Sequence, residues 1–153
     1  MVANDNSMDE WAERELMATR LIAVLRELVF RAFREPEHLA QCWGPKGFRN
    51  TVHEFDFRPG GHLRLTLHGP DGTDYENEYV VLEAAEPERI VISHPDPEHK
   101  FRLTIILAEE GENTRLTWRM RFESVEHCNQ VKPFVAKANE QNLDRLELEL
   151  AKM

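Results

Sequence analysis

Seven histidines are the first side chains to test for metal binding or acid–base chemistry. They are His38, His53, His62, His68, His94, His99 and His127. A helical zinc site would place two histidines four residues apart, but no pair has that spacing and no Cys-x-x-Cys motif accompanies them. We therefore expect surface or capping roles for them, and neither a bound metal nor a cofactor.

Serine and cysteine could act as nucleophiles, but neither has the sequence context that such chemistry needs. None of the three serines lies in a Gly-x-Ser-x-Gly motif. Cys42 and Cys128 are too few and too far apart for a zinc knuckle or a disulfide framework. His127 precedes Cys128, yet adjacent helical residues point about 100° apart. We expect two reduced thiols that fill packing space, and we assign no catalytic residue.

Polar side chains on otherwise apolar faces are better candidates to orient a ligand. His53 shares a strand face with Phe55, and His94 shares one with Ile92. Asn142 interrupts the apolar stripe of the last helix. In an apolar pocket an ionisable group has a shifted pKa and can serve as acid or base. The alternative is that each group is solvated or bonded to the backbone.

Large apolar side chains complete the set of pocket candidates: Trp43, Phe48, Phe55, Tyr79, Phe101, Trp118, Met120 and Phe134. Each could line either the core or a cavity, and plain core packing is favoured for any one of them. Their size alone does not separate a filled core from a hollow one.

Periodicity predicts the elements that must position these groups. Residues 15–24 read as a strand with two partly covered faces. Apolar spacing predicts a short helix over 27–33, and Pro36 fits the first turn of a second over 37–43, which Gly44-Pro45 ends. Alternation predicts strands over 48–57, 63–67, 74–85, 90–94, 101–107 and 116–122. Turns are expected at Pro59-Gly60-Gly61 and at 69–72.

The C-terminal part predicts a long amphipathic helix. Ser124 is a suitable N-cap, and an apolar stripe follows from Val131 to Leu150. Proline in a helix interior removes a hydrogen bond and clashes with the preceding turn. We therefore expect a short helix over 125–131, a kink or break at Pro133, and then the main helix.

Together the elements predict an α+β fold: a curved antiparallel sheet of about six or seven strands wrapped around the long C-terminal helix, with two short helices between the first two strands. Residues 15–153 form one domain, preceded by a flexible acidic segment over 1–14. A ligand cavity is expected between sheet and helix. A continuous space above about 300 Å³ would favour binding, whereas solid packing would contradict it.

Charge and hydropathy argue against nucleic acid and the membrane interior as partners of this chain. The formal net charge is −9 and no basic stripe is present, so nucleic acid is a poor partner. No apolar run is long enough for membrane insertion. The first fifteen residues lack the basic and apolar regions of a secretory signal, which favours a cytoplasmic location.

Several motifs, in order, resemble the START-like helix-grip (SRPBCC) superfamily. They are Glu27-Leu28-Val29-Phe30, Pro36-Glu37-His38-Leu39, Trp43-Gly44-Pro45, Asp56-Phe57-Arg58-Pro59-Gly60-Gly61 and Asp71-Gly72. The nearest likeness is to the bacterial branch named after the C-terminal domain of the activator of heat-shock-protein-90 ATPase, and it covers residues 16–150. Two positions depart from the family pattern. Leu25 stands where proline is usual, and Cys42 replaces the first of two tryptophans, which would enlarge the pocket mouth or leave a thiol facing it.

The resemblance implies a helix-grip fold with a hydrophobic cavity, but not one chemistry. Our first hypothesis is a module that binds a small apolar or amphipathic molecule. The second, less favoured, is a pocket enzyme that catalyses proton transfer, cyclisation or hydrolysis with His or Glu as acid or base. The third is an interaction domain, such as a chaperone-binding accessory protein of the stress response. A homodimer and a chaperone contact stay open.

Overall fold

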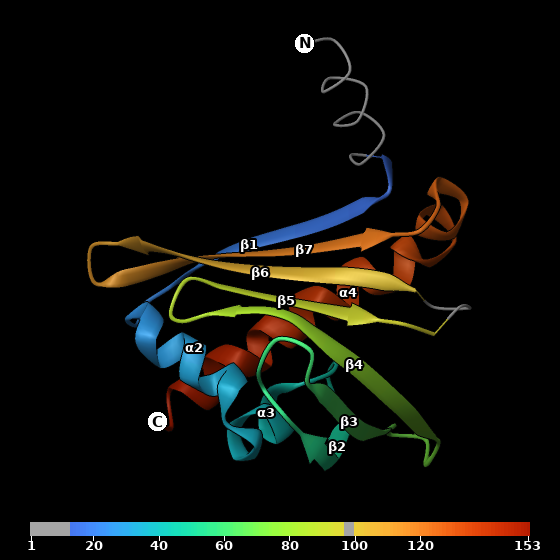
Figure 1. The fold of residues 1–153 in the computed structure, drawn as a ribbon, viewed down its shortest axis with the longest axis horizontal. Coiled ribbons are helices and arrows are strands. Elements are labelled where there is room, and N and C mark those ends of the chain that lie inside the picture. The colour runs from blue at the N-terminus through green and yellow to red at the C-terminus, as the bar shows by residue number, and fades with distance from the viewer. Residues whose placement is uncertain (1–12, 97–99) are drawn as a thin grey trace, which may run out of the picture.

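One antiparallel sheet and a long helix organise this computed structural model, which describes residues 13–96 and 100–153 (Figure 1). The sheet has seven strands in the order β1-β7-β6-β5-β4-β3-β2. The predicted α+β helix-grip architecture is therefore confirmed. The flexible segment expected over 1–14 lies almost wholly outside the described residues, as does His99. Among the described helices, none is both long and apolar enough to cross a membrane.

The strands follow the predicted order with small shifts at their ends. They are β1 (Glu15–Ile22), β2 (Arg49–Phe55), β3 (His62–His68), β4 (Asp74–Ala85), β5 (Arg89–His94), β6 (Phe101–Glu110) and β7 (Asn113–Phe122). The last hairpin is tighter than expected because Gly111 adopts a positive φ of 63°, which allows a short turn between β6 and β7.

The helices are α2 (Arg26–Arg34), α3 (Pro36–Cys42) and α4 (Val125–Leu150). Ser124 caps α4 as predicted, because its side chain accepts a hydrogen bond from the His127 N–H at 3.0 Å. Of the kink or break expected at Pro133, the break is absent, since α4 is continuous from 125 to 150. Pro133 and Asn129, the residue four positions earlier, are both exposed. Water can therefore bond the carbonyl that the proline leaves unpaired, which lowers the cost of keeping the helix intact.

The core lies between one face of the sheet and the helices. Figure 1 shows α4 crossing that face, with α2 and α3 near its C-terminal half. Alternate residues of β6 and β7, such as Leu103, Ile105 and Leu116, point inward and meet Leu143 and Leu146 of α4. Each of these five side chains is at most 1% exposed, so burial of this shared apolar face holds sheet and helix together.

A β-bulge in β2 changes which residues face the core. The register with β3 shifts between Val52 and Glu54, so His53 is the extra residue. Val52 pairs with inward-facing Leu65, whereas Glu54 pairs with outward-facing Arg64. His53 is therefore exposed on the outer face of the sheet. The inward orientation predicted from simple alternation is wrong, because a bulge shifts the alternation by one residue.

Candidate functional site

An open groove of about 580 Å³ lies at one end of the fold. Its walls come from the loop after α3, from β3 and β4, from the end of β5 and from the start of β6. Phe48, Tyr75 and Phe101 supply aromatic surface, and His94 lies among them. The structure thus brings together three of the predicted pocket residues, Phe48, His94 and Phe101. Tyr75 was not among the predicted residues.

Ring contacts fix the aromatic side of this groove. The Phe48 and Tyr75 ring centroids are 6.0 Å apart, and the His94 and Phe101 rings stack at 5.1 Å. Tyr79 meets the edge of His94 at 5.3 Å from behind. Offset and edge-to-face contacts of this kind stabilise ring positions. The groove therefore offers a flat molecule a wall that is already ordered.

His94 is the titratable group most closely integrated into the groove. Its side chain is buried, and its Nε2 lies 3.1 Å from Asn77 Oδ1. With Nε2–H donating to the amide oxygen, Asn77 orients the ring. Asp96 and Glu76 also line the groove, so its polar side carries carboxylates.

The space between the sheet and the two short helices is nearly filled. The cavity there measures about 20 Å³, which is room for about one water molecule, and its lining residues come mainly from α2, α3 and the sheet. Trp43 and Tyr79 help to line it, and Trp43 Nε1 donates to the Tyr79 hydroxyl at 3.4 Å. Burial raises the pKa of Tyr79 to about 12, so this phenol stays neutral at ordinary pH. The ligand cavity expected between sheet and long helix is not found among the described residues, because apolar side chains such as Leu143 and Leu146 of α4 pack directly against the sheet. The predicted pocket residues Phe48, His94 and Phe101 instead meet at the open groove.

Two further predicted residues, besides Trp43 and Tyr79, belong to this packed interior. Trp118 and Met120 are buried on β7, and the Trp118 ring lies 5.7 Å from that of Trp43. The sequence could not separate core from pocket here, because both require large apolar side chains. Trp43 and Tyr79 are also core residues, although they lie directly behind the groove.

Three predicted residues lie away from the groove. His53 is on the outer face, where its Nε2 lies 2.7 Å from the Thr66 hydroxyl. Phe55 stacks on Phe57 at 5.8 Å, and the Phe134 side chain is 77% exposed on α4. None of the three is among the residues that line the groove.

Asn142 and Arg145 attach the groove-forming loop to α4. Asn142 is buried, and its Oδ1 accepts from the Gly44 N–H at 2.6 Å. The Arg145 guanidinium donates to the carbonyls of Gln41, Trp43, Gly44 and Pro45 at 2.8–3.2 Å. These carbonyls form the negative end of α3 and the loop that follows it. Burial lowers the pKa of Arg145. Sequence reasoning missed Arg145, whose only signal was a cation between Leu143 and Leu146.

Comparison with known proteins places this geometry in a family. The profile of the family described as "Activator of Hsp90 ATPase homolog 1-like protein" matches residues 23–151. The chain belongs to this family. Among curated proteins, none matches the chain.

Solved structures of proteins from several bacteria have the same fold as this chain. A protein from Nitrosomonas europaea has a TM-score of 0.84 and 24% identity over 92% of this chain and 96% of its own. A protein from Arthrobacter aurescens has a TM-score of 0.85 and 18% identity over 93% and 88%. The AHSA1 protein from Silicibacter pomeroyi has a TM-score of 0.72 and 22% identity over 90% and 97%. At these identities the likeness shows the fold alone.

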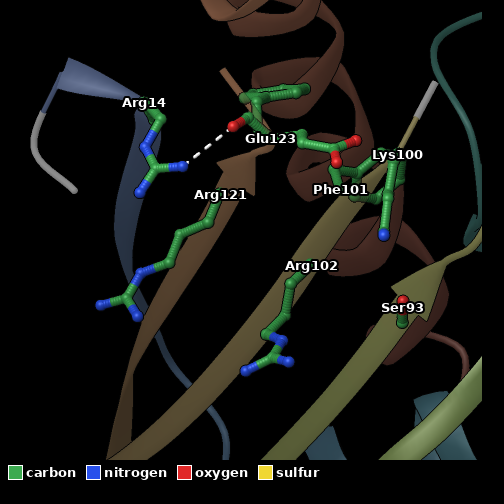
Figure 2. Close-up of a pocket in the computed structure, with 8 residues that line it drawn as sticks. Arg14, Ser93, Lys100, Phe101, Arg102, Arg121 and Glu123 are labelled. Atoms are coloured by element: carbon green, nitrogen blue, oxygen red, sulfur yellow. Dashed lines mark hydrogen bonds between the residues drawn. The ribbon is translucent and has the colours of Figure 1, made fainter. Parts of the chain in front are cut away.

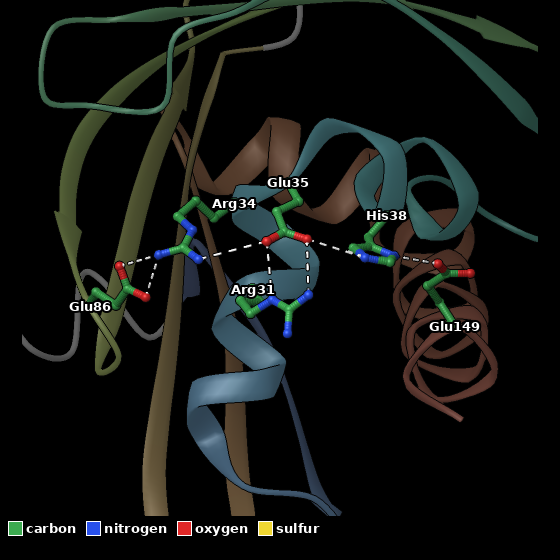
Figure 3. A network of polar contacts seen from close by, with 6 residues as sticks. All are labelled: Arg31, Arg34, Glu35, His38, Glu86 and Glu149. Atoms are coloured by element: carbon green, nitrogen blue, oxygen red, sulfur yellow. Dashed lines mark hydrogen bonds and ion pairs between the residues drawn. The ribbon is translucent and has the colours of Figure 1, made fainter. Parts of the chain in front are cut away.

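A second polar cluster joins α2, α3 and α4 (Figure 3). His38 lies between two carboxylates, with Nδ1 2.7 Å from Glu149 and Nε2 3.2 Å from Glu35. Arg31 bonds to Glu35 at 3.0 Å and thereby lowers the pKa of that carboxyl. Glu37 is close enough to form a three-ligand group with Glu35 and His38. Because Glu35 and His38 already have these partners, we interpret the cluster as a structural link between α2, α3 and α4.

Cys42, expected to enlarge the pocket mouth or to leave a thiol facing it, is instead completely buried against α4 and does not line the groove. Burial raises the pKa of its thiol to about 12. We therefore expect iodoacetamide at pH 8 to label Cys42 at least about 100-fold more slowly in the folded Cys128→Ala variant than in the same variant in urea. Peptide mass spectrometry over time would measure this ratio. Rapid labelling of the folded protein would mean that the thiol faces the groove.

Proposed function

We propose that this protein is a binding module that holds a small apolar or amphipathic molecule in the groove. The observation that carries the proposal is the meeting of Phe48, Tyr75 and Phe101 around an open space of about 580 Å³. Ligand sites are typically concave, largely apolar and about 300–1,000 Å³ in volume. The groove meets these conditions, whereas the enclosed cavity of about 20 Å³ does not.

The polar residues of the groove favour an amphipathic ligand. Asn77 and Asp96 line the groove together with its aromatic rings, and the His94 ring stacks on Phe101 while its Nε2 bonds to Asn77. An apolar body would stack on Phe48 and Phe101, while a hydroxyl or amine would bond to the amide and carboxylate groups. The carboxylates disfavour an anionic head group at this position.

A neutral fluorescent probe, N-phenyl-1-naphthylamine, tests the proposal without involving charge. We expect Tyr75→Ala and Phe48→Ala each to weaken probe binding about tenfold, because each removes a ring that the probe would stack against. Leu82→Ala is a matched control: it lies on the same strand as Tyr75 with a similar exposure, 41% against 46%, and falls outside the groove. Probe titration monitored by fluorescence gives the three dissociation constants.

The result that would overturn the proposal is equal affinity in all three variants and the unaltered protein. Urea unfolding of each variant identifies any loss of binding that comes from loss of the fold. Native mass spectrometry of protein purified from its own host would then identify the class of the natural ligand.

A second function, acid–base catalysis in the same groove, is favoured by one observation: Asn77 orients the buried imidazole of His94 at 3.1 Å. Native mass spectrometry of His94→Gln and of the unaltered protein, both purified from the host, tests this function. An enzyme without its acid or base keeps unreacted substrate, so the molecule bound to the variant would differ in mass from the molecule bound to the unaltered protein. If the same molecule is bound to both, the protein binds without turnover. A homodimer and a chaperone contact stay predictions.

A further inference from the structure

A hollow of about 310 Å³ on the outer side of the sheet collects positive charge (Figure 2). Four cationic side chains line it: Arg14 before β1, Lys100 and Arg102 at the start of β6, and Arg121 near the end of β7. Glu123 is the one acidic residue among its lining residues. The chain as a whole has 28 acidic and 19 basic residues, so this local balance is opposite to the overall one.

Two of these cations lie directly opposite each other. Arg102 pairs with Arg121 in the register of β6 and β7, and Figure 2 shows both side chains extending in the same direction from neighbouring strands. Like charges at opposed positions of a sheet destabilise it. Folding of the sheet does not need two arginines at these opposed positions. Because the pair costs stability, its presence points to a function such as ligand binding.

One carboxylate beside the hollow lies between two arginines. Glu15 Oε1 lies 3.0 Å from Arg121 and 3.2 Å from Arg119, so one acid serves two guanidinium groups. Arg14 donates to the backbone carbonyl of Glu123 at 2.9 Å. Within residues 13–96 and 100–153, no carboxylate forms an ion pair with Arg102 or Lys100.

We propose that this hollow binds a phosphate group, either of a small phosphate monoester or of a lipid head group. Guanidinium groups match phosphate oxygens in a two-bond geometry, and lysine adds a mobile point charge. A dianion would lie between Arg102 and Arg121 and turn their repulsion into attraction. The Ser93 hydroxyl in the same lining could donate a further hydrogen bond. This proposal does not depend on the groove, whose polar side is acidic.

Thermal unfolding in inorganic phosphate, compared with chloride of equal ionic strength, tests the site. For a dissociation constant of about 5 mM, 50 mM phosphate should raise the Tm of the unaltered protein by about 3–6 °C. Arg102→Gln should lose most of this increase. Arg89→Gln, which removes an exposed arginine from the outer face of β5, is the matched control and should keep it. Phosphate also stabilises folded proteins in general. This general effect is the same in Arg89→Gln and in Arg102→Gln, so the difference between the two variants reports binding at the site.

A second readout needs no ligand. Because Arg102→Gln removes a like-charge pair, we expect it to raise the Tm in phosphate-free buffer by about 1–3 °C. Co-sedimentation then separates the two sources of phosphate. Binding to vesicles that contain phosphatidic acid, but not to pure phosphatidylcholine vesicles, assigns the lipid head group, whereas a phosphate effect without vesicle binding assigns a soluble ligand. Equal phosphate-dependent shifts in Arg102→Gln, Arg89→Gln and the unaltered protein would overturn the proposal.

Discussion

Replacing Arg145 with methionine should reduce the free energy of unfolding by about 3–5 kcal/mol, because four carbonyls lose a charged donor at once. These carbonyls belong to residues 41 and 43–45 and lie 2.8–3.2 Å from the guanidinium. Water can replace some of the bonds, since the side chain is part-buried, which keeps the expected loss below the sum of four charged hydrogen bonds. Urea unfolding followed by circular dichroism measures the change.

The same substitution should also weaken binding in the groove. Pro45 and Phe48 line the groove, and the loop that carries them is attached to α4 mainly through Arg145 and Asn142. Lys137→Met removes an exposed cation from the same helix and should change stability by less than about 0.5 kcal/mol. If Arg145→Met and Lys137→Met reduce the free energy of unfolding by the same amount, the hydrogen bonds from Arg145 to the loop do not contribute to stability.

Gly61→Ala should be the most damaging single-methyl change in the turn between β2 and β3. A Cβ at this position would lie 2.0 Å from the Asp56 carbonyl oxygen, far inside van der Waals contact. Backbone atoms cannot move aside as a flexible side chain can, and Gly61 also accepts a hydrogen bond from Val81 N–H at 2.9 Å. We expect a loss of at least about 3 kcal/mol, because relief of the clash requires the turn to separate from β4.

Gly60→Ala is the neighbouring control, and it separates steric clash from backbone strain. Gly60 has a φ of 85°, but a Cβ there would meet no atom within 4 Å. Its cost should be only that of a left-handed alanine, about 1–2 kcal/mol. Chemical unfolding of both variants gives the order of the two effects. A greater loss for Gly60→Ala than for Gly61→Ala would contradict the predicted contact with Asp56.

Local patterns were sufficient to predict most elements of this fold. The alternation of Leu63, Leu65 and Leu67 predicts β3 and its inward face, and Ser124 predicts the start of α4, as the structure confirms. The family resemblance added the helix-grip arrangement of sheet and long helix, whereas the order of the strands within the sheet comes from the structure. These features depend on residues close together in sequence or on a pattern repeated across the whole chain.

The candidate site was less predictable because it depends on contacts between distant residues. A bulge that alternation cannot detect turns His53 outward, and only packing against α4 shows that Cys42 is enclosed. The sequence pattern around Tyr75 indicates only a strand. Its place in the groove depends on the contact with Phe48, which lies 27 positions earlier in the chain. Arg145 has no signal of its own, since its partners are main-chain carbonyls that any loop would supply.

The pairing of β1 with β7 has a consequence for synthesis on the ribosome. Glu15 pairs with Arg121 and Ile22 with Thr114, so the first strand is complete long before its partner exists. At about 5–20 residues per second, that wait lasts about 5–20 s. During this time Met17 and Leu21, still 57% and 43% exposed in the finished protein, lie on an unpaired strand that can join another nascent chain. The last strand to be translated therefore determines when the first is protected.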